Sequence, residues 1–231
     1  MKYAIVQFPG SNCDQDTLHA VKTIMEQDAE LVWYAHRLSS SYDCVILPGG
    51  FSYGDYLRPG AIARFAPVME DVISLANSGT PVIGICNGFQ ILLESGLLPG
   101  AMLQNRAIHF ICKQVHIKCL SDNSPFTNQI TPGEVLKVPV AHMDGNYYCD
   151  DASYEMLESQ NRILFKYCDP EGNVSDEFNP NGSRANIAGI CNEGRNVFGL
   201  MPHPERAVED ILGSGDGIKL FQSIFQHIQK A

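Results

Sequence analysis

The chain has 231 residues, of which 45% are hydrophobic and 18% charged, a balance that suits one large globular domain with a substantial core. The formal net charge is -10 and the isoelectric point is near 5.0, so phosphate backbones and anionic lipid surfaces are disfavoured partners. No apolar run approaches membrane-spanning length, and the chain opens on a strand-like segment rather than a signal sequence. We therefore expect a cytoplasmic protein that binds neither nucleic acid nor membranes.

Apolar residues in the first hundred positions alternate between strand-like and helix-like spacing. This spacing predicts strands over 3–8, 31–35, 44–47 and 82–85, and helices over 14–27, 60–77 and 87–93. Alternating strands and helices with short connections predict an α/β fold, with a mostly parallel, doubly wound sheet that carries helices on both faces. Ligands of such sheets bind at the carboxyl ends of the strands, and Gly10, Gly50 and Cys86 all follow such ends.

The pattern is strand-rich between residues 100 and 201. It predicts strands over 107–120, 134–141, 162–167, 185–191 and 196–201, a loop over 169–183 and a final helix over 217–230. We interpret this part as a partly antiparallel excursion of one domain rather than as a second domain.

Eight cysteines could indicate disulfides or a metal site, but none forms a C-x-x-C pair and no secretory signal is present. Reduced thiols are therefore expected. The nearest metal-like pattern is His109, Cys112, His116 and Cys119. Polar and apolar residues alternate over 114–119, which is typical of a strand and would place His116 and Cys119 on opposite faces. We therefore expect no metal site.

Cys86 is the candidate nucleophile. It lies between a β-branched strand and a helix, and Gly84 and Gly88 flank it as in a nucleophile elbow. The unpaired N–H groups of the new helix would favour thiolate over thiol. The alternative is a core cysteine at the end of a strand.

His203 and Glu205 are the candidate base and its orienting carboxylate. Prolines at 202 and 204 bias the segment to extended geometry, in which residues i and i+2 point to the same side. Glu205 could then hold one imidazole nitrogen while the other faces a nucleophile. A histidine between prolines is more often a turn residue, but its combination with the Cys86 elbow favours catalysis.

Several motifs resemble those of a known family. The signatures of class I, triad-type glutamine amidotransferases are similar to G-I-C-N-G-F-Q at 84–90, P-G-G-F at 48–51 and M-P-H-P-E-R at 201–206. Further segments resemble the glutaminase subunits of phosphoribosylformylglycinamidine synthases: F-P-G-S-N-C-D from Phe8, S-Y-G-D-Y-L-R-P-G-A from Ser52, N-P-N-G-S at 179–183, N-I-A-G-I at 186–190 and V-F-G-L-M-P-H-P-E-R from Val197. The resemblance runs nearly end to end and implies one flavodoxin-like glutamine amidotransferase domain over 1–231.

The resemblance also implies roles for individual residues. Cys86 would be the nucleophile, His203 the acid and base, and Glu205 its partner. An oxyanion would be held by the N–H groups of Gly50 and Asn87, and glutamine would be bound by Gly49, Gln90, His142, Asp144 and Gly145. The chain departs from the family pattern at position 144, where glutamate is expected. The shorter aspartate leaves open whether the side chain contacts glutamine, but not whether the backbone does.

The same resemblance implies a complex. A large synthetase subunit would use ATP and magnesium to convert formylglycinamide ribonucleotide into formylglycinamidine ribonucleotide, with ammonia supplied through a channel and a small third subunit as bridge. The sequence has no G-x-x-x-x-G-K-[ST] motif, so no cofactor is expected in this chain. Three alternatives remain: a glutaminase that serves a GMP, carbamoyl phosphate or imidazole glycerol phosphate synthetase, a cysteine hydrolase or peptidase, and a non-catalytic binding module on the same fold.

Overall fold

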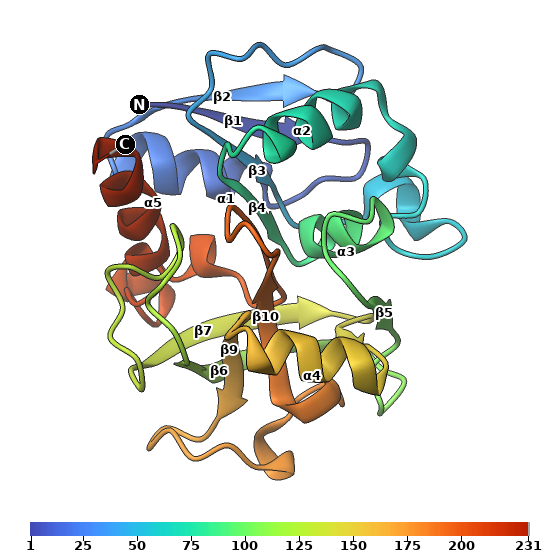
Figure 1. The fold of residues 1–231 in the computed structure, drawn as a ribbon, viewed down its shortest axis with the longest axis vertical. Helices are drawn as coiled ribbons and strands as arrows, with labels where there is room; N and C mark the ends of the chain where they lie inside the picture. Colours follow the sequence, from blue (N-terminus) through green and yellow to red (C-terminus); the bar gives the residue numbers. More distant parts are fainter. Residues whose placement is uncertain (231) are drawn as a thin grey trace.

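One nine-stranded sheet runs through the computed structural model, which describes residues 1–230 (Figure 1). The strand order is β2-β1-β3-β4-β11-β10-β9-β6-β7. The first five strands in this order are parallel: β2 (Asp28–Trp33), β1 (Lys2–Gln7), β3 (Cys44–Leu47), β4 (Val82–Ile85) and β11 (Val197–Leu200). Strands β1 to β4 lie in the upper half of Figure 1. The carboxyl ends of the five parallel strands therefore share one edge of the sheet, as predicted.

The strand-rich second half continues this same sheet with antiparallel pairing. From β11 outward the strands are β10 (Ile187–Cys191), β9 (Ile163–Cys168), β6 (Ile111–Cys119) and β7 (Val135–His142). A separate two-stranded sheet pairs β5 (Ala101–Leu103) with β8 (Asn146–Tyr148). The predicted α/β class with its antiparallel part is confirmed, and the antiparallel strands extend the main sheet.

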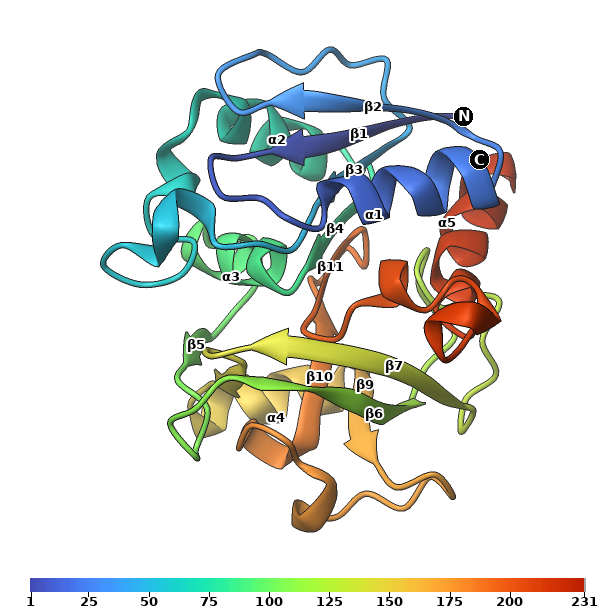
Figure 2. The same ribbon diagram turned by 180° about the vertical axis from the view of Figure 1, so that it is seen from behind.

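Helices cover both faces of the parallel strands. In Figure 1, α2 (Pro67–Asn77) and α3 (Asn87–Glu94) lie in front of the sheet, and Figure 2 shows α1 (Asp14–Leu18) on the opposite face. The C-terminal helix α5 (Ile218–Lys230) lies beside α1, and α4 (Asp151–Ser159) covers the antiparallel strands. One buried apolar cluster extends through both halves of the sheet.

Several segments differ from the predicted elements, among them the unpredicted strands β5 and β8, and three differences concern helices. The helix predicted over 14–27 is α1 followed by a π-helical turn, His19–Ile24. The helix predicted over 60–77 begins only at Pro67, because the residue before a proline avoids helical geometry and Ala66 is extended. Helix α4 was not predicted, although the Asp150 side chain caps it by accepting a 2.8 Å hydrogen bond from the backbone N–H of Ser153.

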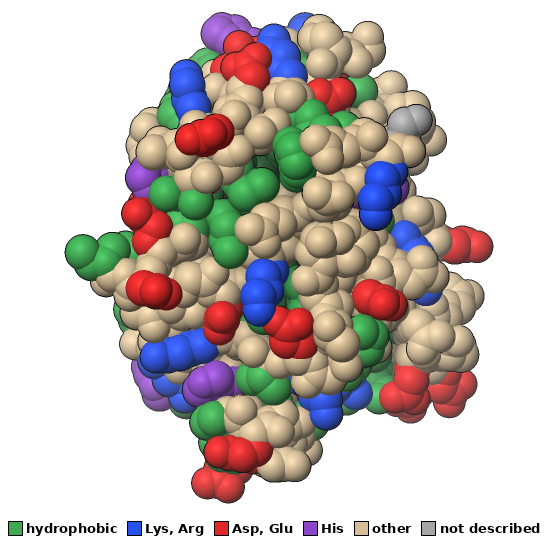
Figure 3. Space-filling model, turned by 90° about the vertical axis from the view of Figure 1, so that its left-hand side faces the viewer, with side chains coloured by type: hydrophobic (Ala, Val, Ile, Leu, Met, Phe, Trp, Pro, Cys, Tyr) green, Lys and Arg blue, Asp and Glu red, His purple; other side chains and the backbone are tan. Residues whose placement is uncertain are grey.

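The surface mixes charges of both signs. Figure 3 shows the face at the left of Figure 1, where acidic and basic side chains are interspersed and apolar side chains gather in the upper half. No helix within residues 1–230 combines the length and the apolar content that a bilayer crossing would need. All eight cysteines are free thiols.

Gly88 lets α3 lie directly against β3, and this close approach can be tested. A Cβ atom at position 88 would come within 2.7 Å of the Leu47 carbonyl carbon. Helix propensity alone favours alanine over glycine by about 1 kcal/mol. We expect the clash to dominate, so that Gly88→Ala lowers the free energy of unfolding in urea by about 2 kcal/mol or more.

Gly96→Ala is the matched control, because position 96 has φ +74° and open space around it. It should lose only about 1 kcal/mol through left-handed strain. A Gly88→Ala protein as stable as the unsubstituted chain would contradict the assigned helix–strand contact.

Candidate active site

Cys86 occupies a strained turn between β4 and α3. Its backbone has φ 51° and ψ -104°, a conformation that non-glycine residues rarely adopt. The Cys86 N–H donates a 2.8 Å hydrogen bond to the carbonyl of Leu200 at the end of β11, which fixes the turn against the neighbouring strand. The thiol therefore lies at the edge where the parallel strands end, and it is 4% exposed.

His203 lies just beyond the end of β11 and is paired with Glu205. Its Nδ1 is 2.6 Å from Glu205 Oε1, and both residues are 1% exposed. The backbone N–H of His203 donates to the Pro139 carbonyl of β7 at 2.8 Å, which fixes its position. The expected extended geometry holds for His203 but not beyond it: Pro204–Arg206 form a 3₁₀ turn, and this turn brings Glu205 back to the imidazole.

The surroundings of His203 favour the imidazolium form. Burial lowers the pKa of His203, but the Glu205 carboxylate and the neighbouring sulfurs of Cys86 and Cys13 raise it. The net result is a pKa well above the usual histidine value. The other nitrogen, Nε2, is buried and has no hydrogen-bond partner within residues 1–230. A protonated imidazole beside a thiol is the arrangement that stabilises a thiolate.

Two cavities border Cys86. The narrower one, of about 20 Å³, is lined by Gly50, Phe51, Asp55, Gln90, Ala141 and the segment 142–144. The wider one, of about 240 Å³, is lined by Asn12, Cys13, Gly50, Phe51, Phe110, Ala141, His203 and Arg206. Cys86 thus separates an acidic and amide-lined space from one that contains the candidate catalytic imidazole.

The predicted oxyanion residues flank the sulfur. Gly50 must lack a side chain, because a Cβ there would lie 2.7 Å from the Gly10 carbonyl oxygen. Asn87 is the first residue of α3, where backbone N–H groups have no partner inside the helix. Gly49 lines neither cavity; its carbonyl accepts hydrogen bonds from the backbone N–H groups of Asn12 and Cys13, at 3.3 and 3.2 Å. Gly49 therefore positions the loop after β1.

A chain of amide hydrogen bonds connects the predicted glutamine-binding residues. Asn87 Nδ2 donates to Gln90 Oε1 at 2.8 Å, and Gln90 Nε2 donates to the Asp144 carbonyl at 2.6 Å. The Asp144 backbone thus faces Gln90, and its side chain lines the narrow cavity.

His142 lines the same cavity, and both of its ring nitrogens have hydrogen-bond partners. Its Nδ1 is 3.0 Å from Asn105 Oδ1 and its Nε2 is 3.4 Å from Asn181 Nδ2. Burial, with a further contribution from nearby His203, lowers the pKa of His142 to about 4, so its ring is neutral at pH 7. Gly145 packs against this ring and lines neither cavity. His142 and Gly145 therefore hold the 142–145 segment in place.

Two residues of the site were not predicted from the sequence. Cys13 lies beside His203, and burial raises the pKa of its thiol. Asp55 lines the narrow cavity opposite Asp144. Both belong to quoted motifs, S-N-C-D and S-Y-G-D-Y, but nothing in their local spacing indicates chemistry, because both reach the site through loops of irregular geometry.

One group of side chains within residues 1–230 could supply three converging metal ligands. The ligand atoms of Cys13, His203 and Glu205 lie within 4.8 Å of one another. The 2.6 Å hydrogen bond between His203 and Glu205 already uses one atom of each. The four residues of the metal-like sequence pattern, 109–119, form no such group in the described part of the chain.

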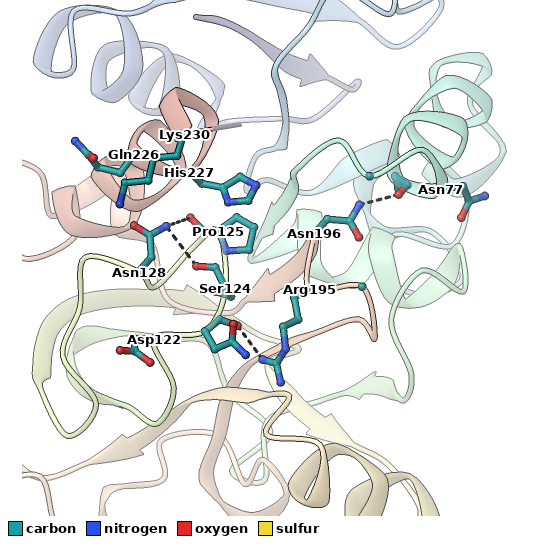
Figure 4. A pocket seen from close by; sticks show the side chains of 14 residues that line it. Asn77, Asp122, Ser124, Pro125, Asn128, Arg195, Asn196, Gln226, His227 and Lys230 are labelled. Atoms are coloured by element: carbon teal, nitrogen blue, oxygen red, sulfur yellow. Dashed lines mark hydrogen bonds between the residues drawn. The ribbon is translucent and has the colours of Figure 1, made fainter.

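A larger cavity of about 680 Å³ lies at the opposite end of the sheet, near the starts of β4 and β11 (Figure 4). Two of its side chains are paired with backbone carbonyls: Asn196 Nδ2 donates to Ala76 at 2.7 Å, and Arg195 Nη1 donates to Asn123 at 3.0 Å. It contains no thiol and no carboxylate–imidazole pair. We therefore place the candidate site at Cys86.

Comparisons with known proteins identify the family to which the chain belongs. A family model described as the CobB/CobQ-like glutamine amidotransferase domain matches residues 1–226. The phosphoribosylformylglycinamidine synthase subunit PurQ of Moorella thermoacetica is 54% identical over 224 residues, covering 97% of this chain and 95% of the relative. The same subunit from Aquifex aeolicus is 52% identical, covering 97% and 99%.

Solved structures give the same result. A chain in the structure of PurLQS from Thermotoga maritima is 44% identical, with a TM-score of 0.87 and 98% of each chain covered. A glutamine amidotransferase from the same organism, at 15% identity and a TM-score of 0.61, shares the fold. Because the family model and the relatives match nearly the whole chain, this protein belongs to the CobB/CobQ-like glutamine amidotransferase family, within the group formed by the PurQ subunits of phosphoribosylformylglycinamidine synthases.

Proposed function

We propose that this chain is the glutaminase subunit of a phosphoribosylformylglycinamidine synthase. It hydrolyses glutamine to glutamate and ammonia, and a synthetase subunit uses the ammonia, with ATP, to convert formylglycinamide ribonucleotide into formylglycinamidine ribonucleotide. The observation that carries the proposal is the buried imidazole of His203, held by Glu205 at 2.6 Å and bordering the same cavity as the Cys86 thiol.

The first half-reaction forms a thioester. The Cys86 thiolate attacks the side-chain carboxamide carbon of glutamine, and negative charge develops on the carboxamide oxygen. The N–H groups of Asn87 and Gly50 stabilise this oxyanion, each donor contributing roughly 3 kcal/mol. The carbon–nitrogen bond then breaks as His203 gives its proton to the departing nitrogen, which leaves as neutral ammonia.

The second half-reaction releases glutamate. Neutral His203 takes a proton from water, the resulting hydroxide attacks the γ-glutamyl thioester, and the Cys86 thiolate leaves. Glu205 holds the ring through Nδ1 in both steps, so that Nε2 carries every proton transfer. The buried and unpartnered Nε2 suits this role.

The two cavities separate the side of the site that binds glutamine from the side on which ammonia leaves. Gln90 and the 142–144 segment line the narrow cavity, where the body of glutamine binds. His203 lines the wider cavity and not the narrow one, so ammonia departs on that side. Ammonia released into water would be protonated and lose its nucleophilicity, so the wider cavity must continue into a partner.

The partners follow from the same chemistry. A synthetase subunit of the PurL type receives the ammonia, and a small PurS-type subunit bridges the complex; PurLQS is the assembly named for the Thermotoga maritima structure. ATP and magnesium belong to the synthetase, and this chain needs no cofactor of its own. A purine-pathway complex of this kind works in the cytoplasm.

Replacing the nucleophile should separate the two activities of the complex. Cys86→Ala removes the attacking atom, so we expect glutamine-dependent product formation to fall at least about 10³-fold while ammonium-dependent formation persists. Assays of the reconstituted complex with each nitrogen source measure this. Cys112→Ala, at an exposed thiol, is the control and should behave as wild type with both sources. Retained activity with glutamine in Cys86→Ala would exclude the mechanism.

Replacing Glu205 should shift the pH profile. The Glu205 carboxylate raises the pKa of His203, and the reaction needs the imidazolium, so activity is lost as pH rises through that pKa. Glu205→Gln removes this contribution. We expect the alkaline limb of the kcat/KM profile to move to lower pH and the value at neutral pH to fall roughly 10²-fold.

Glu209→Gln is the matched control for this experiment. Glu209 also pairs with a histidine, His19 at 2.8 Å, but on the surface. The pH profile of kcat/KM for Glu209→Gln should match that of the wild type. An unchanged alkaline limb in Glu205→Gln would show that Glu205 does not control the protonation of His203.

The isolated chain should be a poor glutaminase. The narrow cavity, of about 20 Å³, holds little more than one water molecule, so glutamine can enter only when the loops around it separate. We expect kcat/KM for glutamine to be at least tenfold lower for the isolated chain than for the reconstituted complex, as measured by glutamate release. Equal rates would show that the partner does not control access to the site.

A further inference from the structure

The narrow cavity beside Cys86 is lined by two carboxylates from separate loops. Asp55 follows β3, and Asp144 follows β7. No lysine or arginine lines this cavity. Asp144 was expected at the glutamine site from its sequence position, whereas no role has been assigned to Asp55.

The carboxylate of Asp55 lacks the partner that its charge requires. Its Oδ1 is buried and accepts no hydrogen bond from residues 1–230. Burial, with a smaller contribution from Asp144, raises the pKa of Asp55 to about 6. Burial also raises the pKa of Asp144. A partly desolvated carboxylate that lies near a second carboxylate forms a site for a cation, because a positive group between them offsets both the repulsion and the lost hydration.

The two loops are held in register across the cavity. The backbone N–H of Ser52 donates to Asn87 Oδ1 at 3.1 Å, and Asn87 Nδ2 donates in turn to Gln90 Oε1. Gln90 then donates to the Asp144 carbonyl. This chain of hydrogen bonds links the Asp55 loop to the Asp144 loop through the first turn of the nucleophile helix α3. The carboxylates are therefore positioned relative to the sulfur.

The backbone that carries Asp55 is strained. Tyr53, Asp55 and Leu57 have φ values of 54°, 54° and 69°, in a region that costs non-glycine residues about 1 kcal/mol or more each. The loop keeps this shape through the 2.7 Å hydrogen bond from the Tyr53 N–H to the Pro9 carbonyl and the edge-to-face contact of Tyr53 with Tyr34. Strain of this kind concentrates where a side chain must be aimed at a ligand.

We propose that Asp55, together with Asp144, binds the α-ammonium group of glutamine and so selects substrates that carry it. The inference rests on the proposed function, in which the carboxamide of glutamine lies at Cys86. With that end fixed, the one cationic group of the substrate lies at its other end, and Asp55 carries a buried carboxylate oxygen without a hydrogen-bond partner on the same cavity. Asp55 is thus a specificity-determining residue that does not take part in the chemical step.

The test compares two substrates in the reconstituted complex: L-glutamine and 4-carbamoylbutanoate, which has the same carboxamide and carboxylate but no amino group. In Asp55→Asn we expect KM for glutamine to rise roughly 10- to 100-fold, as for loss of a hydrogen bond to a charged group, with a smaller change in kcat. The kcat/KM for 4-carbamoylbutanoate should change less than about threefold. If its turnover is too slow to measure, its inhibition constant against glutamine gives the same comparison.

Two further variants make the result specific. Asp55→Glu keeps the charge and should recover part of the preference for glutamine. Glu177→Gln removes an exposed carboxylate that lines neither cavity at Cys86 and should match the wild type. Equal losses with both substrates in Asp55→Asn would show that the residue only supports the loop, which would overturn the proposal. Failure of the wild-type complex to use glutamine would instead overturn the proposed function.

Discussion

The single-residue turn at Cys86 is the constraint on which the site depends. Strand β4 is paired on both sides, with β3 and β11, so the position of its carboxyl end is fixed. Helix α3 begins at the next residue and packs through Gly88 against β3. The chain must therefore reverse within one residue, and the positive φ of Cys86 is the result. The thiol projects from the edge where the neighbouring strands also end, and the other groups need only lie beyond those ends to reach it.

Much of the fold around Cys86 could be predicted from the sequence, because the strands and the helix there depend on local periodicity. The strand at 82–85, the following helix and the strand at 197–200 are all short apolar patterns with clear breaks, and parallel pairing brings their carboxyl ends together. The proximity of Cys86 and His203 then follows from β4 and β11 being neighbours. The glycine-rich segment after β3 lies near Cys86 and His203 as well, because β3 is the other neighbour of β4.

The other parts of the site depend on contacts between segments far apart in the sequence, and no local pattern predicts such contacts. Strand β7 is at the far edge of the sheet, yet its Ala141 carbonyl lies 3.8 Å from the Cys86 sulfur, because the antiparallel strands fold back across the edge of the parallel half. Glu205 reaches His203 through a 3₁₀ turn rather than through strand alternation. Asp55 and Cys13 arrive on loops whose geometry is set by contacts with other loops.

The charges around Cys86 divide the site into two functional sides. The narrow cavity has carboxylates, no lysine or arginine, and a neutral His142 ring, so it retains a cation, which the substrate carries and the neutral product ammonia does not. The wider cavity has no carboxylate among its lining residues and is bordered by Arg206, so its lining offers no negative charge that would stabilise an ammonium ion. Because His203 lines that side and returns to its neutral form as ammonia leaves, the cavity favours release of the uncharged molecule. The same distribution of charge that selects the substrate therefore keeps its nitrogen in the nucleophilic form that a synthetase requires.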